Sequence, residues 1–368
     1  MEENHKKLLR ALAIYLPQFH PIPENDKWWG KGFTEWRNVV KGKPILKGQY
    51  QPHLPADLGF YDLRLPEIRE QQAEMARKYG IYGFCYYHYW FNGKLMLEKP
   101  LQEVIKTEKP DFPFCICWAN ENWSRRWDGD DKEILMEQNY SEMDHRKHIE
   151  YLCQNIFNDS RYITIDSKPV FIVYAPDLIP DLDESIDIWN EIAMAYGFKG
   201  LYVICFLKWN TSARCLDIKN INALAEFSPF LKTGKVQRSL LDKIIVKMGF
   251  PMTARQKNKI IAYTDLVDNV DKKYQSNGKL IYPCVTPMWD NYVRRRNGNA
   301  GIYIGSTPSL YGKWLEFSCR EFVPPNNFEN FIFINAWNEW AEGNHLEPCE
   351  KWGHSYLEST HSVLNKYK

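Results

Sequence analysis

The sequence has no excess of charge of either sign and no long apolar run. It contains 47 Lys and Arg against 46 Asp and Glu, which gives a net charge of +1. Proteins that bind nucleic acid or anionic membranes usually present a basic patch or a basic run, and neither occurs here. No segment approaches the roughly 20 consecutive apolar residues that a membrane-spanning helix needs. The sequence therefore predicts a protein with no nucleic-acid partner and no membrane span.

Cysteine pairs and cofactor motifs are also missing. The nine cysteines are scattered, with no C-x-x-C pair among them. There is no H-E-x-x-H, G-x-G-x-x-G or P-loop motif, so we expect neither a metal nor another cofactor. The N-terminal stretch is broken by Pro17 and lacks a small-residue cleavage site, and we interpret it as a first strand rather than a signal peptide. These features favour a reducing, cytoplasmic location.

Aromatic residues, in contrast, are plentiful. They make up 15% of the chain, with 14 Trp and 22 Tyr. Trp and Tyr combine a flat apolar face with a polar group, and the CH-rich face of a sugar stacks well on such a surface. A large aromatic core is the plainer explanation and accounts for part of the content. A glycan is therefore the substrate class to test against the rest of the sequence.

Strand-like apolar runs alternate with amphipathic stretches along the whole chain. The strand-like runs are 12–19, 82–90, 112–119, 169–175, 200–207, 222–228, 279–287 and 331–337. The helix-like segments are 65–79, 144–157, 183–196, 259–274 and 309–322. No linker or repeat marks a domain boundary. The pattern predicts a single α/β domain, residues 1–368, folded as a (β/α)8 TIM-type barrel with long βα loops; a doubly wound open sheet is the alternative.

Polar and aromatic residues gather where the predicted strands end, and the strand starts carry nothing comparable. In a (β/α)8 barrel the carboxyl ends of the strands carry the active site, so this asymmetry favours an enzyme. The candidate substrate-contacting residues are Tyr15, His20, Trp36, His88, Trp90, Trp118, Asn120, Glu121, Trp123, Arg125, Arg126, Trp127, Glu226, Trp289, Asp290, Asn338 and Trp340.

Plainer interpretations compete with these assignments. Single histidines such as His20 and His88 are more often hydrogen-bonded packing residues than catalysts. The dense loop at 117–131 could be a sugar-binding wall of Trp and Arg side chains, or a buried Arg–carboxylate network that stabilises a long loop. The segment 289–298, with Asp290 and three arginines, could clamp a phosphate or a uronate. We favour a solvated loop there.

Two glutamates three residues apart, Glu339 and Glu342, follow the apolar run 331–334. Glycosidic bonds are usually broken by two carboxyl groups. Positions i and i+3 face opposite sides of a strand but are neighbours on a helical turn, where two carboxylates push their pKa values apart. The two glutamates can therefore share a site if the chain turns after Trp337. A solvated first helical turn is the alternative.

A different reaction is suggested by Asp128 and Asp130, which match the D-x-D pattern of many nucleotide-sugar glycosyltransferases. About one such match is expected by chance at this Asp frequency, and Asp181 with Asp183 is a second. The D-x-D signal is therefore weak.

Five segments together closely resemble the WbsX-like family: AIYLPQFHP, WWGKGFTEW, YGFCYYHYWF, CWANENWSRRWDG and NAWNEWAEGNHLEP. The resemblance runs from about Ala11 to Tyr356. Members of that family are often labelled glycosyltransferases of bacterial surface-polysaccharide loci and are related to glycoside hydrolase family 99. The resemblance implies a (β/α)8 barrel that acts on a bacterial polysaccharide or oligosaccharide.

The segment EWAEG matches the catalytic segment of family 99. The resemblance implies that Glu339 acts as a base on the substrate's own 2-hydroxyl, which gives a 1,2-anhydro sugar, and that Glu342 acts as the acid. Configuration would be retained without a covalent enzyme intermediate. We therefore expect a retaining glycoside hydrolase or transglycosidase. The alternatives are a nucleotide-sugar-dependent glycosyltransferase of lipopolysaccharide or capsule biosynthesis, and a glycan-binding protein without catalysis.

Overall fold

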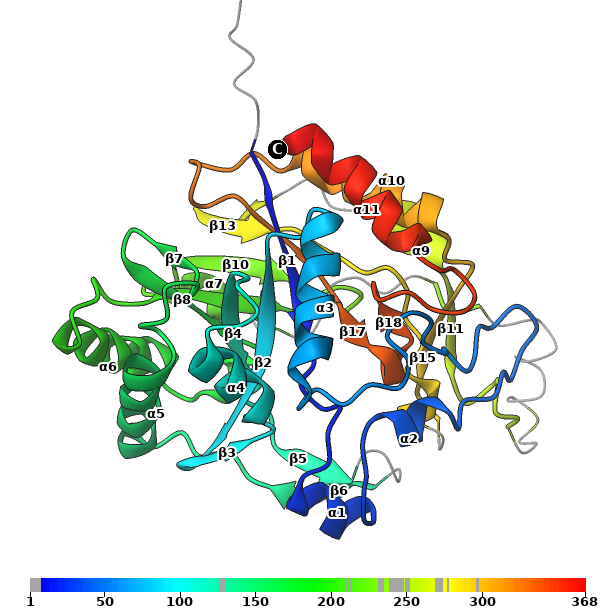
Figure 1. The fold of residues 1–368 in the computed structure, drawn as a ribbon, viewed down its shortest axis with the longest axis horizontal. Helices are drawn as coiled ribbons and strands as arrows, with labels where there is room; N and C mark the ends of the chain where they lie inside the picture. Colours follow the sequence, from blue (N-terminus) through cyan, green and yellow to red (C-terminus); the bar gives the residue numbers. More distant parts are fainter. Residues whose placement is uncertain are drawn as a thin grey trace, which may run out of the picture.

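The computed structural model describes residues 8–125, 130–208, 211, 214–230, 235–237, 248, 252–268, 274–276, 278–295 and 298–368. Its centre is a nearly closed barrel of parallel strands in the order β13-β10-β9-β8-β4-β2-β1-β16-β14 (Figure 1). Consecutive strands β13 and β14 are separated only by Pro283; β13 pairs with β10 and β14 pairs with β16. The predicted barrel is confirmed, and each of the eight predicted runs contains barrel strand.

The barrel strands are β1 (Arg10–Tyr15), β2 (Gly83–Phe91), β4 (Phe114–Trp118), β8 (Lys168–Val173), β9 (Tyr202–Leu207), β10 (Ala223–Glu226), β13 (Lys279–Tyr282), β14 (Cys284–Val285) and β16 (Phe331–Ile334). The α-helices between and after them are α3 (Pro66–Lys78), α4 (Lys99–Thr107), α5 (Glu142–Asn155), α6 (Leu182–Ala195), α7 (Arg214–Asp217), α9 (Tyr263–Asp268), α10 (Pro308–Glu321) and α11 (Ser355–Leu364). Helices α10 and α11 pack side by side, at the top of the view in Figure 1.

The remaining elements belong to the connections. The helices are α1 (Pro23–Trp29), α2 (Trp36–Val39) and the 3₁₀ turns η2 (Pro176–Leu178), η3 (Tyr292–Arg294), η4 (Trp340–Glu342) and η5 (Asn365–Tyr367). The strands are β3 (Lys94–Met96), β5 (Trp123–Arg125), β6 (Asp130–Met136), β7 (Thr164–Ile165), β11 (Lys259–Ala262), β12 (Gln275–Ser276), β15 (Gly301–Ile304), β17 (Asn338–Glu339) and β18 (Asn344–His345).

Local sequence explains why the elements begin and end where they do. Helix α5 begins after Ser141, whose side chain accepts a hydrogen bond from the Asp144 backbone N–H and so satisfies one of the free donors of the first turn. Every residue of β2 is buried, as expected for a strand that is covered on both faces. At Gly83 a Cβ atom would lie 2.6 Å from the Pro113 carbonyl oxygen, so only glycine allows β2 to approach the neighbouring segment this closely.

One predicted helix is wrong in its first four residues. The segment 259–274 reads as amphipathic, but residues 259–262 form β11, which pairs in parallel with β15, and α9 begins at Tyr263. Ile260 and Ile261 are β-branched and buried, and a partner strand about forty residues further along the chain supplies their hydrogen bonds. Tertiary pairing therefore overrides the local helical pattern.

The interior is one large apolar cluster that includes residues from Leu9 to Leu364. All nine cysteines are buried in the structure and none forms a disulfide. Within the described part of the chain, no helix combines the length and the apolar character that crossing a bilayer requires.

Candidate active site

A cavity of about 640 Å³ lies at the carboxyl ends of the barrel strands. Its lining includes residues that directly follow five of these strands: Leu16 after β1, Ala119 after β4, Tyr174 after β8, Lys208 after β9 and Phe227 after β10. A volume of this size is typical of sites that hold a small ligand. The carboxyl ends of the barrel strands thus surround a hollow.

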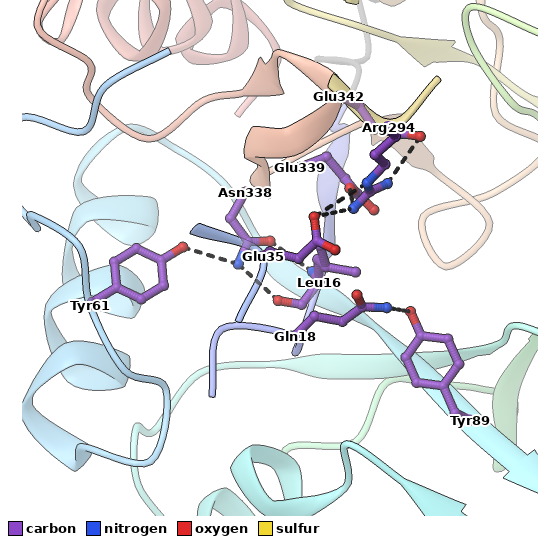
Figure 2. Close-up of polar contacts among 9 residues, drawn as sticks. All are labelled: Leu16, Gln18, Glu35, Tyr61, Tyr89, Arg294, Asn338, Glu339 and Glu342. Atoms are coloured by element: carbon purple, nitrogen blue, oxygen red, sulfur yellow. Dashed lines mark hydrogen bonds and ion pairs between the residues drawn. The ribbon is translucent and has the colours of Figure 1, made fainter. Parts of the chain in front are cut away.

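The turn that carries Glu339 and Glu342 is anchored to β1. The Asn338 amide accepts a hydrogen bond from the Leu16 N–H at 2.7 Å and donates one to the Leu16 carbonyl at 3.0 Å (Figure 2). The chain then leaves β17 and makes the 3₁₀ turn η4, which ends at Gly343 with a φ of 56°. At Gly343 a Cβ atom would lie 3.0 Å from a His53 ring nitrogen. The turn after Trp337 is therefore present, and both glutamates line the cavity.

Arg294 joins the two glutamates to a third carboxylate. One terminal nitrogen, Nη1, lies 3.0 Å from Glu342 Oε1, and the other, Nη2, lies 3.1 Å from Glu339 Oε2 (Figure 2). The same Nη2 lies 3.0 Å from Oε2 of Glu35, which is fully buried at the start of α2. Three carboxyl groups from segments far apart in the sequence thus converge on one guanidinium.

The cluster contains three carboxyl groups but only one guanidinium. Burial raises the pKa of Glu339, and Arg294 opposes that effect while Glu342 and Glu35 reinforce it. Burial also raises the pKa of Glu342, again against the opposing charge of Arg294. Two close carboxyl groups titrate as a pair, because the charge on one disfavours the charge on the other. The arrangement favours a state in which one carboxyl of the pair keeps its proton near neutral pH.

The cavity walls are rich in aromatic rings. Trp28, Trp29 and Trp123 line one side, and the Trp28 and Trp123 rings meet edge to face with centroids 5.9 Å apart. Tyr89 lines the cavity near Gln18, whose amide donates to the Tyr89 hydroxyl at 3.2 Å (Figure 2). Such rings offer stacking faces for sugars, and the polar groups between them can bind hydroxyls.

A second ion pair lies on the wall formed by β4 and β9. Lys208 Nζ lies 3.6 Å from Glu121 Oε1 and 3.3 Å from the centre of the Tyr174 ring. The lysine charge is therefore balanced by a carboxylate and by a cation–π contact.

Four of the residues predicted from sequence line the cavity: Glu121, Trp123, Glu339 and Glu342. Arg125 lies beside it, with its guanidinium carbon 5.7 Å from the centre of the Trp29 ring and an ion pair to Glu133. Arg126 and Trp127 lie outside the described residues, as does Asp128 of the D-x-D match. Their predicted roles stay predictions.

The other predicted contacts lie behind the cavity lining, where protein groups hold them. The polar contacts are those of Tyr15 with Gln72, Trp36 with the Tyr61 carbonyl, His88 with His148, Trp90 with Asp144, Asn120 with Ala175, Glu226 with the Cys284 N–H, Asp290 with Gln49, Asn338 with Leu16 and Trp340 with Glu347. Trp118 and Trp289 are buried among aromatic rings, and His20 is buried close to Asp62. These residues shape the lining from behind, and direct contact with a substrate stays a prediction for them.

Neither Arg294 nor Glu35 is among the site residues predicted from sequence. The pattern of 289–298 favours a solvated loop, but Asp290 and Arg294 are largely buried and Arg294 forms ion pairs with three glutamates. The only signal for Glu35 was its place in the WWGKGFTEW segment. Among the described residues no group of three His, Cys, Asp or Glu side chains could hold a metal ion.

A parallel barrel whose aromatic-walled cavity contains a close pair of carboxyl groups is the arrangement of a carbohydrate-active enzyme. The family model for Glycosyltransferase WbsX matches residues 11–360, and the chain belongs to this family. The protein WxcX of two strains of Xanthomonas campestris pv. campestris is 37% identical over 363 residues. That match covers 96% of this chain and 49% of WxcX, so the chain spans about half the length of these relatives.

The fold is shared with solved structures. The GH99 endo-alpha-mannosidase of Bacteroides thetaiotaomicron superposes with a TM-score of 0.59 over 97% of both chains, at 13% sequence identity. A structure described as a glycoside hydrolase-like protein gives a TM-score of 0.59 at 12% identity, over 98% of this chain and 94% of the other. At such identities the likeness establishes the fold alone.

Proposed function

We propose that the chain is a retaining enzyme of glycosidic bonds that acts on a bacterial surface polysaccharide or oligosaccharide. The observation that carries the proposal is the pair Glu339 and Glu342, which line one cavity and contact the two terminal nitrogens of the same guanidinium. Membership of the WbsX family and the barrel shared with a GH99 enzyme support the same reading.

In the first step the Glu339 carboxylate takes the proton of the sugar 2-hydroxyl, and O2 attacks the anomeric carbon. The bond from that carbon to the glycosidic oxygen breaks, and Glu342 gives its proton to the departing oxygen. In the second step Glu342 takes a proton from water or from a sugar hydroxyl, which attacks the anomeric carbon and opens the 1,2-anhydro ring. Glu339 returns its proton to O2. Two inversions leave the configuration unchanged.

The charges around the pair supply one ionised and one protonated carboxyl group. The mechanism needs one ionised and one protonated carboxyl at the start, and a buried, coupled pair with raised pKa values supplies that state. The side chain of Glu342 is 20% exposed and that of Glu339 is 6% exposed. The more exposed group is therefore the better placed to exchange protons with the incoming acceptor.

The decisive experiment compares glycosides that have and lack the 2-hydroxyl. We expect activity on a panel of α-linked aryl glycosides, with the product anomer followed by NMR and seen to retain configuration. The matched 2-deoxy glycoside should be inert, because it has no internal nucleophile. Inversion, or rapid turnover of the 2-deoxy substrate, would contradict the mechanism. An α-mannosyl member belongs in the panel because the solved GH99 relative is an endo-alpha-mannosidase.

A second candidate, transfer from a sugar nucleotide, is favoured by the description of the family as a glycosyltransferase. It predicts metal-dependent binding of a sugar nucleotide, with Asp128 and Asp130 as its residues. Calorimetry with nucleotide sugars and Mn²⁺ tests it. Loss of that binding in Asp128→Asn would support it, and an absence of heat with any nucleotide sugar would remove it.

A further inference from the structure

One wall of the cavity differs in charge from the others. It is formed by β11 and β15, which lie side by side outside the barrel (Figure 1). Lys259 at the start of β11 lines the cavity together with Arg295, which follows η3. We call these two cations and the strands behind them the basic wall.

The basic wall is built and held in place by backbone hydrogen bonds. The Lys259 N–H donates to the Ala300 carbonyl at 2.8 Å, which fixes the base of its side chain. The Asn291 side chain accepts from the Gly301 N–H at 3.0 Å, and the Tyr303 N–H donates to the Trp289 carbonyl at 2.9 Å. The wall is thereby tied to the segment that carries Arg294 and Arg295.

The other cations of the lining are paired with carboxylates. Lys208 pairs with Glu121, and Arg294 pairs with Glu35, Glu339 and Glu342. Within the described part of the chain, by contrast, no carboxylate forms an ion pair with Lys259 or Arg295. Lys259 is exposed to the cavity and Arg295 is half-buried. Two cations without such an ion pair favour an anion in the space before them.

The basic wall also lies close to the acid pair. Burial has the largest influence on the pKa of Glu342, and Arg294 and Arg295 both act against it. A group bound by Arg295 is therefore within electrostatic reach of the bond that Glu342 would protonate. The lining also includes Trp28 and Trp123, whose aromatic rings offer neutral stacking surface.

We propose that the basic wall binds an acidic group, a carboxylate or a phosphate, that the glycan substrate carries beside the bond on which the enzyme acts. That the ligand is a glycan rests on the proposed function. That it carries an acidic group rests on the basic wall alone. Guanidinium and ammonium donors recognise either oxyanion, with the planar fork of Arg295 suited to two-point contact. The substrate class is thus a sugar acid or a phosphorylated sugar rather than a neutral glycan.

Binding of matched probes tests the inference without turnover. The probes are methyl α-D-glucopyranoside, the corresponding glucuronoside, the corresponding 6-phosphate and UDP, each titrated by ligand-observed NMR at low and at physiological salt. We expect the acidic glycosides to bind at least about tenfold more tightly than the neutral one, because hydrogen bonds between charged groups are stronger than those between neutral groups. The preference should weaken with salt. The tighter of the two acidic glycosides identifies the oxyanion.

Variants then show which residues cause the preference for acidic glycosides. The double variant Lys259→Gln/Arg295→Gln should bind all three glycosides equally, whereas Lys257→Gln, an exposed neighbour outside the lining, should behave as wild type. Equal affinity for neutral and acidic glycosides in wild type, or a preference that survives the double variant, would overturn the inference. Binding of UDP alone would overturn the assignment to a glycan. Glu342→Gln should keep the acidic preference, so a failure of the catalytic proposal is distinguishable from a failure of this one.

Discussion

Two buried glutamate sites only a few residues apart differ in their partners and in their access to the cavity. Glu347 lies beneath the cavity and accepts hydrogen bonds from the Gln72 amide, the Tyr61 hydroxyl and the Trp340 indole N–H, at 2.6, 2.8 and 2.6 Å. Its partners are neutral, and it has no place in the cavity lining. Glu339 and Glu342 face the cavity and have a cation for a partner.

The difference teaches that burial alone does not mark a catalytic acid. Burial raises the pKa of Glu347 to about 7, and it also raises the pKa values of Glu339 and Glu342. What separates the sites is access and the nature of the partners. A carboxyl enclosed by neutral donors stabilises the fold, whereas a coupled pair open to a cavity can exchange protons.

The largest effect is expected from Glu342→Gln. The amide keeps the size of the side chain but cannot donate a catalytic proton, so kcat on a substrate with a poor leaving group should fall by about 10²–10⁴-fold. The melting temperature should stay within a few degrees of wild type, measured by calorimetry. Glu350→Gln, an exposed change in the same segment, is the control and should leave kcat unchanged. Unchanged turnover in Glu342→Gln would remove the acid assignment.

Glu347→Ala should act on stability instead. It leaves the donors of Tyr61, Gln72 and Trp340 buried without an acceptor, and each costs roughly 1–3 kcal/mol, so we expect a loss of about 4 kcal/mol in the free energy of unfolding. Urea titration at fixed pH measures it. A loss below about 1 kcal/mol would show that the network contributes little.

The raised pKa of Glu347 should make the stability of the protein depend on pH. The folded-state pKa of Glu347 lies above its ordinary value of 4.5, so the folded protein keeps a proton that the unfolded chain has lost between pH 4.5 and about 7. The associated stability is present below pH 4.5 and is lost as the pH rises through about 7. Relative to Glu347→Gln, the unfolding free energy of wild type should fall by about 3 kcal/mol across this window. Parallel stability curves for the two proteins would contradict the shift.

Arg294→Met should change the pH dependence of the activity. Removing the cation disfavours the ionised form of both neighbouring glutamates, so their pKa values should rise further. The acidic limb of the pH–rate profile, which reports ionisation of the base, should then move upward by about 1–2 pH units. Arg294→Lys should restore part of the shift. A profile that keeps its midpoint while kcat falls would indicate a purely structural role.

Much of the fold follows from local sequence. Runs such as 82–90 and 331–337 are continuous and apolar, and a strand buried on both faces needs little else to be recognised. Helices such as α5 and α10 have a capping residue at their start. The predicted helix at 259–274 is wrong in its first four residues because Lys259–Ala262 pairs with a strand whose position the local pattern does not contain.

The site was predictable only in part. Spacing and the resemblance of EWAEG selected Glu339 and Glu342, and the dense loop after β4 supplied Glu121 and Trp123, which line the cavity. Polar strand-end residues such as His88 and Trp118 turned out to lie behind that lining. A strand end places a residue at the rim, but which face its side chain takes depends on the neighbouring loops.

The sequence by itself determined the alternation of strands and helices, the barrel that follows from it, and the two glutamates, because these depend on periodicity and short motifs. Only the tertiary structure decided which charges meet. Arg294 and Glu35 are 259 positions apart, and their ion pair forms only when the α2 loop and the η3 turn are brought over the same strand end. An ion pair depends on distance in space, and no local pattern records that distance.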